Sequence, residues 1–190
     1  MNRKKKRSTA SISQRLLCAL ILLLLGACGG VRTVDQTVAI PTLDLFAFFE
    51  GHTQAWGVVQ DWRGRVVRQF VVHIEGIVDH DKLTLEEVFD YADGERDFRR
   101  WKIRRDSSGG ISGTANDIIG AAVGEINGNS LIWRYEMELE SEGRRYLVTF
   151  DDRLWQVDDD TLINRTYIKK FGLTVAEVSL FMRRSGDYQP

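Results

Sequence analysis

The alternation of side chains constrains the fold of this chain more than any other feature. From Thr53 onward, runs rich in Val, Ile, Thr and aromatic residues follow one another, each about 8 to 14 residues long and closed by a turn signal. In 131–139 every odd-numbered residue is apolar or aromatic, and three of the even-numbered residues are charged. A period of two places one set of side chains on a buried face and the other in water. The pattern predicts antiparallel β-structure.

The residues between the runs support the same interpretation. Asp93-Gly94 and Asn127-Gly128 tolerate the backbone conformations of tight hairpins. The two prolines are Pro41 and Pro190, so neither interrupts hydrogen-bonded ladders in the runs between them. We expect nine or ten strands. A short helical turn within 44–50 should place its apolar side chains under one end of the sheet.

A meander of this length either closes on itself or exposes two strand edges, and closure removes both edges. We therefore predict an all-β fold, an antiparallel meander closed into a β-barrel of about 8 to 10 strands. An interior of that size is filled by side chains or holds one small ligand. A β-sandwich is the alternative architecture.

The N-terminal segment has the pattern of an export signal. A basic stretch, 3–7, precedes the ten-residue apolar run 16–25. Since a membrane-spanning helix needs about 20 apolar residues, this run is too short for a permanent span. The following Leu25-Gly26-Ala27-Cys28 resembles the bacterial lipobox, in which the cysteine receives lipid before cleavage. The alternative is an ordinary secretory signal cut near Ala27, with Cys28 a bystander.

The lipobox resemblance implies that Cys28 becomes a lipidated N-terminus. Two or more acyl chains anchor a protein stably, whereas one chain binds a membrane only marginally. Gly29 rather than Asp follows the cysteine, which in Gram-negative sorting favours the outer membrane, with the domain facing the periplasm. We expect three parts: a signal peptide at 1–27, a lipidated tether at 28–42 and a β-barrel domain at 43–190.

Charge and cysteine content narrow the functional classes. Removal of 1–27 leaves 163 residues with 20 Lys and Arg against 27 Asp and Glu, a formal charge of −7. A chain this acidic is not expected to bind nucleic acid. Cys18 lies in the signal and Cys28 is expected to carry lipid, so no pair remains for a disulfide. One domain stabilised by its own hydrophobic core is the expectation.

Two resemblances to known families supplement these patterns. The opening 51–57, with its early Trp56, resembles the start of lipocalin-type calycin barrels. Nearly all of the mature chain is similar to an uncharacterised family of bacterial lipoproteins, domain of unknown function 3833. The segments that carry this similarity are Trp56-Gly57, Arg68-Gln69-Phe70, Asp93-Gly94, Arg99-Arg100-Trp101, Asp117 with Gly120 and Gly124, Asn164-Arg165, and Lys170-Phe171-Gly172. The family resemblance implies an envelope address, a lipocalin-like barrel and one functional residue, Cys28. It implies no reaction.

The sequence shows no motif for metal binding or nucleophilic catalysis. His52, His73 and His80 lack the spacings that chelate zinc. The acidic pairs and triplets at 151–152 and 158–160 lack the interleaved glycines of a calcium loop and are interpreted as solvated turn residues. We therefore predict no metal, no cofactor and no catalytic nucleophile.

Several polar residues share the parity of apolar neighbours and are candidates for the barrel interior. Buried charges require partners, so internal pairing of Arg with Glu among packed aromatic residues is one interpretation. The other is a pocket in which aromatic side chains surround a ligand and Arg68 or Arg99 meets a carboxylate or phosphate head group. The candidate ligand-binding residues are Trp56, Arg68, Glu87, Arg99, Trp101, Trp133 and Tyr135.

Three functions remain open from the sequence. The first is a membrane-anchored barrel, held through Cys28, that binds an apolar or amphipathic molecule such as a lipid or fatty acid. The second is a non-catalytic scaffold that recruits an envelope enzyme through its acidic surface; the sequence identifies no protein partner. The third is a small-molecule isomerase or hydrolase with Glu87 as its base.

Overall fold

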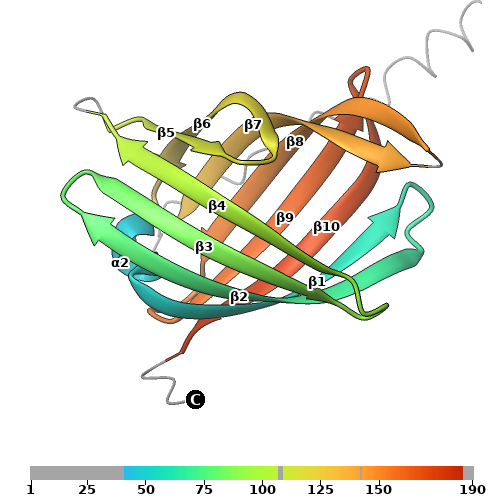
Figure 1. The fold of residues 1–190 in the computed structure, drawn as a ribbon. Coiled ribbons are helices and arrows are strands. Elements are labelled where there is room, and N and C mark those ends of the chain that lie inside the picture. Colours follow the sequence, from blue (N-terminus) through green and yellow to red (C-terminus); the bar gives the residue numbers. More distant parts are fainter. Residues whose placement is uncertain (1–40, 107–108, 142, 186–190) are drawn as a thin grey trace, which may run out of the picture. The chain divides into compact units, whose positions relative to one another are not determined.

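The structure is a computed structural model that describes residues 41–106, 109–141 and 143–185. In this part of the chain ten antiparallel strands form one sheet that closes into a barrel (Figure 1). The strands are β1 (Gly51–Asp61), β2 (Val66–Asp79), β3 (Lys82–Tyr91), β4 (Arg96–Arg105), β5 (Ile111–Ala115), β6 (Ile118–Asn127), β7 (Ser130–Ser141), β8 (Arg144–Gln156), β9 (Thr161–Lys170) and β10 (Leu173–Arg184). The predicted closed barrel is confirmed, and the sandwich alternative is wrong.

The barrel has the simplest connectivity available to ten strands. Each strand pairs with its neighbours in sequence, and β1 closes the sheet against β10, with Trp56 opposite Phe181. Because the strands run alternately up and down, the hairpin turns lie alternately at the two ends. The connections β1–β2, β3–β4, β5–β6, β7–β8 and β9–β10 share one end, which we call the open end. The barrel lies within one compact unit, 38–190.

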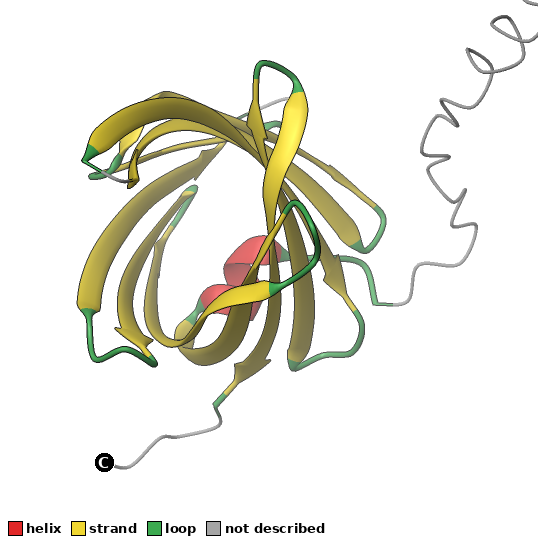
Figure 2. Ribbon diagram, turned by 90° about the vertical axis from the view of Figure 1, so that its right-hand side faces the viewer, coloured by secondary structure: helices red, strands yellow, loops and turns green. Residues whose placement is uncertain are grey.

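The opposite end is covered by the short helix α2 (Leu45–Phe49), which lies across the barrel interior in Figure 2. The Asp44 side chain caps it by accepting hydrogen bonds from the amides of Phe46 and Ala47, at 3.2 and 3.3 Å. Four of its five residues are buried. Gly76 of β2 permits this close approach, because a Cβ there would stand 1.7 Å from the carbonyl oxygen of Phe49. The helix therefore plugs this end, as the sequence predicted.

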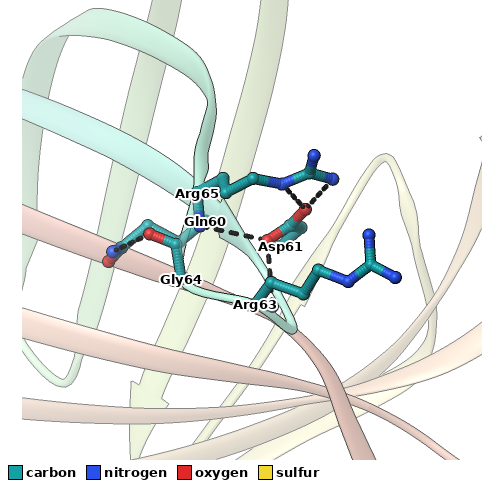
Figure 3. A network of polar contacts seen from close by, with 5 residues as sticks. All are labelled: Gln60, Asp61, Arg63, Gly64 and Arg65. Atoms are coloured by element: carbon teal, nitrogen blue, oxygen red, sulfur yellow. Dashed lines mark hydrogen bonds and ion pairs between the residues drawn. The ribbon is translucent and has the colours of Figure 1, made fainter.

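At the open end, the β1–β2 turn is held by one carboxylate (Figure 3). Asp61 accepts hydrogen bonds from the amides of Arg63 and Arg65, at 2.9 and 3.0 Å. Its other oxygen accepts from Nε and Nη2 of Arg65, at 2.8 and 2.6 Å. Gly64 provides the positive φ of 78° that the turn requires, and its carbonyl oxygen accepts a hydrogen bond from the side-chain Nε2 of Gln60. These contacts hold the tip of the hairpin in one conformation.

The predicted signal peptide, Cys28 and most of the predicted tether lie outside the described residues. Within the described part, no helix has both the length and the apolar character needed to cross a membrane.

Candidate ligand cavity inside the barrel

A cavity of about 620 Å³ occupies the barrel interior. Inward-facing side chains of the strands line it, and Leu45 and Phe49 of α2 form its floor. The volume falls within the range of about 300 to 1,000 Å³ that is common for small-molecule sites. The interior is thus large enough for one ligand.

Aromatic side chains form much of the cavity wall. Trp101 of β4 meets Trp133 and Tyr135 of β7 edge to face, with ring centroids 5.6 and 5.3 Å apart. Tyr135 stacks on Phe150 of β8 at 5.0 Å. Nearer the open end, a second group of rings lies 5.5 to 6.2 Å apart; its members are Phe70, Phe89 and Tyr91. Rings packed in these geometries make a stable apolar surface with little freedom to rearrange.

A cluster of polar side chains interrupts this apolar wall. Arg99 of β4 donates a hydrogen bond from Nε to Oδ2 of Asp117 in the β5–β6 turn, at 2.8 Å, and its Nη2 forms an ion pair with the same oxygen, also at 2.8 Å. Nη2 also reaches the sulfur of Met137 at 3.8 Å. Glu87 is opposite Arg99 in the β3–β4 ladder, and Asp152 of β8 also lines the cavity. Three strands and one turn therefore bring charged groups to the interior.

Burial raises the pKa of two carboxyl groups in this cluster. The pKa of Glu87 is raised to about 7 by burial, against the opposing effect of Arg99. The pKa of Asp152 is also raised to about 7 by burial, against the opposing effects of Thr166 and Arg99. Both side chains line the cavity, so a molecule inside it can reach them. Both the protonated and the ionised form of each group are therefore populated near neutral pH.

The neighbouring groups keep their protons. Burial, reinforced by the charge of Asp152, raises the pKa of Tyr135 well above its usual value, so its hydroxyl remains a donor. Burial by itself would lower the pKa of Arg99, but Tyr135, Glu87 and Asp117 together raise it. The cluster therefore contains one permanent cation, one neutral phenol and three carboxyl groups. Within the described residues, no three potential metal ligands are arranged to hold an ion.

Arg68 of β2 lies nearer the open end of the cavity. Its Nε is 3.5 Å from Asp93, and its Nη2 donates to Glu95, both in the β3–β4 turn. Its guanidinium also lies over the ring of Tyr91, at 3.4 Å from the centroid. The guanidinium of Arg68 is thus already paired with acidic side chains of the protein.

A family model described as a protein of unknown function, DUF3833, matches residues 22–184. The chain belongs to the DUF3833 family. No curated protein matches this chain. In this DUF3833 member, the ten-stranded closed barrel is consistent with the lipocalin-like architecture expected from the sequence.

Six of the seven candidate residues line the cavity of this DUF3833 barrel: Arg68, Glu87, Arg99, Trp101, Trp133 and Tyr135. Their placement follows from the period of two on β2, β3, β4 and β7. Internal pairing of Arg with acid, the alternative interpretation, also occurs, but Arg99 pairs with Asp117 rather than with a Glu.

The expected interior position of Trp56 is wrong. Its side chain is 43% exposed on the outer face of β1, where it packs against Phe181 at 6.0 Å. The inward residues on either side of Trp56 are the small Ala55 and Gly57. A Cβ on Gly57 would stand 2.4 Å from the ring of Phe70. The Phe70 ring therefore fills the interior space next to Gly57.

The expectation that Asp151 and Asp152 are solvated turn residues is also wrong. Both lie within β8 and are only 2% and 7% exposed. Asp151 faces outward between Lys169 and Arg134, whereas Asp152 faces the cavity. Since Phe150 and Leu154 share the parity of Asp152, alternation was the signal that could have identified it. Asp117 gave no such signal, because it lies in a turn.

Proposed function

We propose that this protein binds one apolar or amphipathic molecule, of the size of a lipid chain or fatty acid, inside its barrel. The cavity carries the proposal: about 620 Å³ of interior space, walled by Trp101, Trp133 and Phe150 and interrupted by a buried polar cluster. Apolar walls with a few placed polar groups are typical of small-molecule sites. A scaffold that acts only through its outer surface needs no such space.

We further propose that the domain works at a membrane surface, anchored through lipid on Cys28 and facing the periplasm from the outer membrane. The open end supports this location. Trp62 in the β1–β2 turn is 69% exposed, and Phe171 in the β9–β10 turn is 94% exposed. The guanidinium of Arg63 lies 4.4 Å from the Trp62 ring centroid, and the Lys170 ammonium lies 5.4 Å from that of Phe171. Exposed aromatic rings beside cations are typical of groups at a bilayer interface.

The experiment for ligand binding is to purify the full chain from its own membranes and identify bound molecules by native mass spectrometry and lipid extraction. A Leu180→Trp variant adds a large ring on the cavity side of β10. Phe181→Trp places the same residue on the outer face and is the matched control. We expect one bound molecule in the wild type and in Phe181→Trp, and none in folded Leu180→Trp. A folded wild type that carries nothing, and takes up neither fatty acids nor uncharged or amine-bearing amphiphiles saturably, would refute the proposal.

The lipid anchor has its own test. Mass spectrometry of the mature N-terminal peptide should find it beginning at Cys28 and carrying acyl chains. Cys28→Ser should leave the protein unlipidated and release it from the membrane fraction. An unmodified Cys28 in the mature chain would show that the segment is an ordinary secretory signal.

A second candidate, a small-molecule isomerase or hydrolase, is favoured by Glu87 and Asp152, two cavity carboxyl groups with pKa values raised to about 7. Such groups can both accept and donate protons near neutral pH. Incubation with an envelope extract in deuterated water tests for proton abstraction. Glu87→Gln should abolish deuterium incorporation and Glu86→Gln, on the outer face of the same strand, should retain it. Absence of incorporation with the wild type would remove the isomerase; a hydrolase would instead be excluded if Glu87→Gln left the turnover of every extract component unchanged.

A further inference from the structure

The charged groups that line the cavity are predominantly acidic. Within the described part of the chain, six Asp or Glu side chains and two guanidinium groups line it. The acidic residues are Glu87, Glu95, Asp97, Glu138, Glu140 and Asp152. A carboxylate or phosphate group entering from the open end would therefore meet mostly like charges, which repel it.

Both cations of the lining are already engaged. Arg99 directs Nε and Nη2 at one oxygen of Asp117. Arg68 is held by Asp93 and Glu95. An anionic head group would have to displace these protein carboxylates before it could use either guanidinium. The head group expected from the sequence, an anion bound by Arg68 or Arg99, is thus not favoured by the geometry.

One carboxyl oxygen of Asp152 has no hydrogen-bond donor in the part of the chain that the structure describes. Thr166 and Tyr135 lower the pKa of this group through side-chain hydrogen bonding. Its Oδ1, however, is buried and accepts no hydrogen bond from the described residues, and the residue is only 7% exposed. Asp152 lines the cavity and lies opposite Trp133 in the β7–β8 ladder. A buried acceptor without a donor is unfavourable, and a ligand N–H or O–H next to it would remove that cost.

The aromatic walls beside Asp152 suit the same chemistry. Phe150 is two residues away on β8 and stacks on Tyr135, while Trp133 is its cross-strand neighbour. Aromatic faces attract cations, and an ammonium group placed here would meet both a carboxylate and ring faces.

We infer that the cavity selects an amphipathic ligand whose polar group donates hydrogen bonds, with a primary ammonium preferred over a hydroxyl, and that Asp152 accepts from it. This inference rests on the proposed function and narrows its ligand class. It predicts that ligands with carboxylate or phosphate head groups bind more weakly than ligands with an ammonium or hydroxyl group.

Four probes with the same eight-carbon tail test the inference: octylamine, octanol, octanoate and octyltrimethylammonium. Each is titrated by calorimetry into the full chain in lipid nanodiscs, with empty nanodiscs as the blank. We expect octylamine to bind about tenfold more tightly than octanoate, with octanol between them. Octyltrimethylammonium has the charge of the amine without its N–H donors, and it should bind more weakly than octylamine.

Asp152→Asn tests the residue assignment. It should weaken octylamine binding about tenfold and leave octanol within about threefold, because a neutral amide still accepts one hydrogen bond. Asp151→Asn removes the same charge from the adjacent position on the outer face and should leave both affinities unchanged. If Asp152→Asn does not fold, the wild-type ranking of the four probes decides the inference.

The outcomes separate the two proposals. Tightest binding of octanoate would overturn the inference while supporting ligand binding itself. Equal binding of octylamine and octyltrimethylammonium would show that charge alone is recognised, and would overturn the donor requirement. Failure of all four probes to bind would count against the proposed function.

Discussion

Glu87 faces Arg99 directly across the β3–β4 ladder, yet the guanidinium of Arg99 is held by Asp117, eighteen residues further along the chain. The ladder places both side chains in the barrel interior, and the β5–β6 turn then supplies the acid that binds the cation. Glu87 is left facing the cavity with a pKa raised to about 7 by burial. The carboxyl group of Glu87 can therefore contact a ligand in the cavity and can bind or release a proton near neutral pH.

The raised pKa of Glu87 predicts how stability depends on pH. Folding raises this pKa from 4.5 to about 7, so the native state holds the proton more tightly than the unfolded state. The free energy of unfolding should therefore fall as pH rises from about 4.5 to 7. Since one unit of pKa shift corresponds to about 1.4 kcal/mol, Glu87→Gln should reduce this fall by about 3 kcal/mol.

Urea unfolding of the wild type and the variant at pH 5 and pH 8 measures this difference. Glu86→Gln is the control, because it removes a carboxylate that faces outward and pairs with Arg100. Identical pH dependence in Glu87→Gln and wild type would contradict the prediction.

The partly buried pair of Arg99 and Asp117 should contribute to stability. Their side chains are 17% and 24% exposed, so Arg99→Gln would leave Asp117 poorly solvated beside other carboxyl groups. We expect a loss of about 2 to 4 kcal/mol in the free energy of unfolding. Asp117→Asn should cost much less in the Arg99→Gln background than alone, as a double-mutant cycle would measure. Additive effects would show that the two side chains do not interact.

Arg165→Gln is the matched surface control. It breaks an ion pair with Glu177 on the outside of the barrel, where the arginine side chain is 49% exposed. Such exposed pairs contribute about 0 to 1 kcal/mol, so this variant should be nearly as stable as the wild type.

Gly76→Ala should loosen the plugged end of the barrel. Its Cβ would collide with backbone atoms of Phe49, which cannot move unless α2 moves. We expect a loss of about 2 kcal/mol and faster hydrogen exchange at the amides of Phe48 and Glu50, which are hydrogen-bonded within α2. Gly64→Ala tests a different cause of destabilisation, because Gly64 has open space around it but a positive φ. This substitution should lower the free energy of unfolding by about 1 kcal/mol without changing hydrogen exchange in α2. Unchanged α2 exchange in Gly76→Ala would contradict the prediction.

The proposed membrane contact of the open end predicts which tryptophan approaches lipid. With the full chain in vesicles whose acyl chains carry bromine, a quencher of tryptophan fluorescence, Trp62→Phe should remove most of the quenching. Trp56→Phe is the control, since Trp56 is also exposed but lies on the barrel wall against Phe181. Equal loss of quenching in both variants, or no quenching in the wild type, would argue against contact through this end.

Much of the barrel was predictable because alternation is a local property. A period of two in 131–139 is sufficient to orient Trp133 and Tyr135, since adjacent side chains on a strand point to opposite faces. Trp56 was misplaced because its own neighbours, Ala55 and Gly57, are too small to identify the buried face. The ring of Phe70, contributed by the next strand, packs against Gly57, and Ala55 is fully buried, so both point inward in the folded barrel.

Local sequence was sufficient to define the strands, their turns and most of the inward-facing residues, because strand alternation and turn preferences act over a few residues. Closure of the barrel was needed to bring β1 against β10 and to pair Arg99 with Asp117. It also leaves a cavity in which one oxygen of Asp152 has no donor among the described residues. These features depend on how closure curves the sheet and brings distant strands together. Curvature sets the distances between side chains on different strands, and no local pattern encodes those distances.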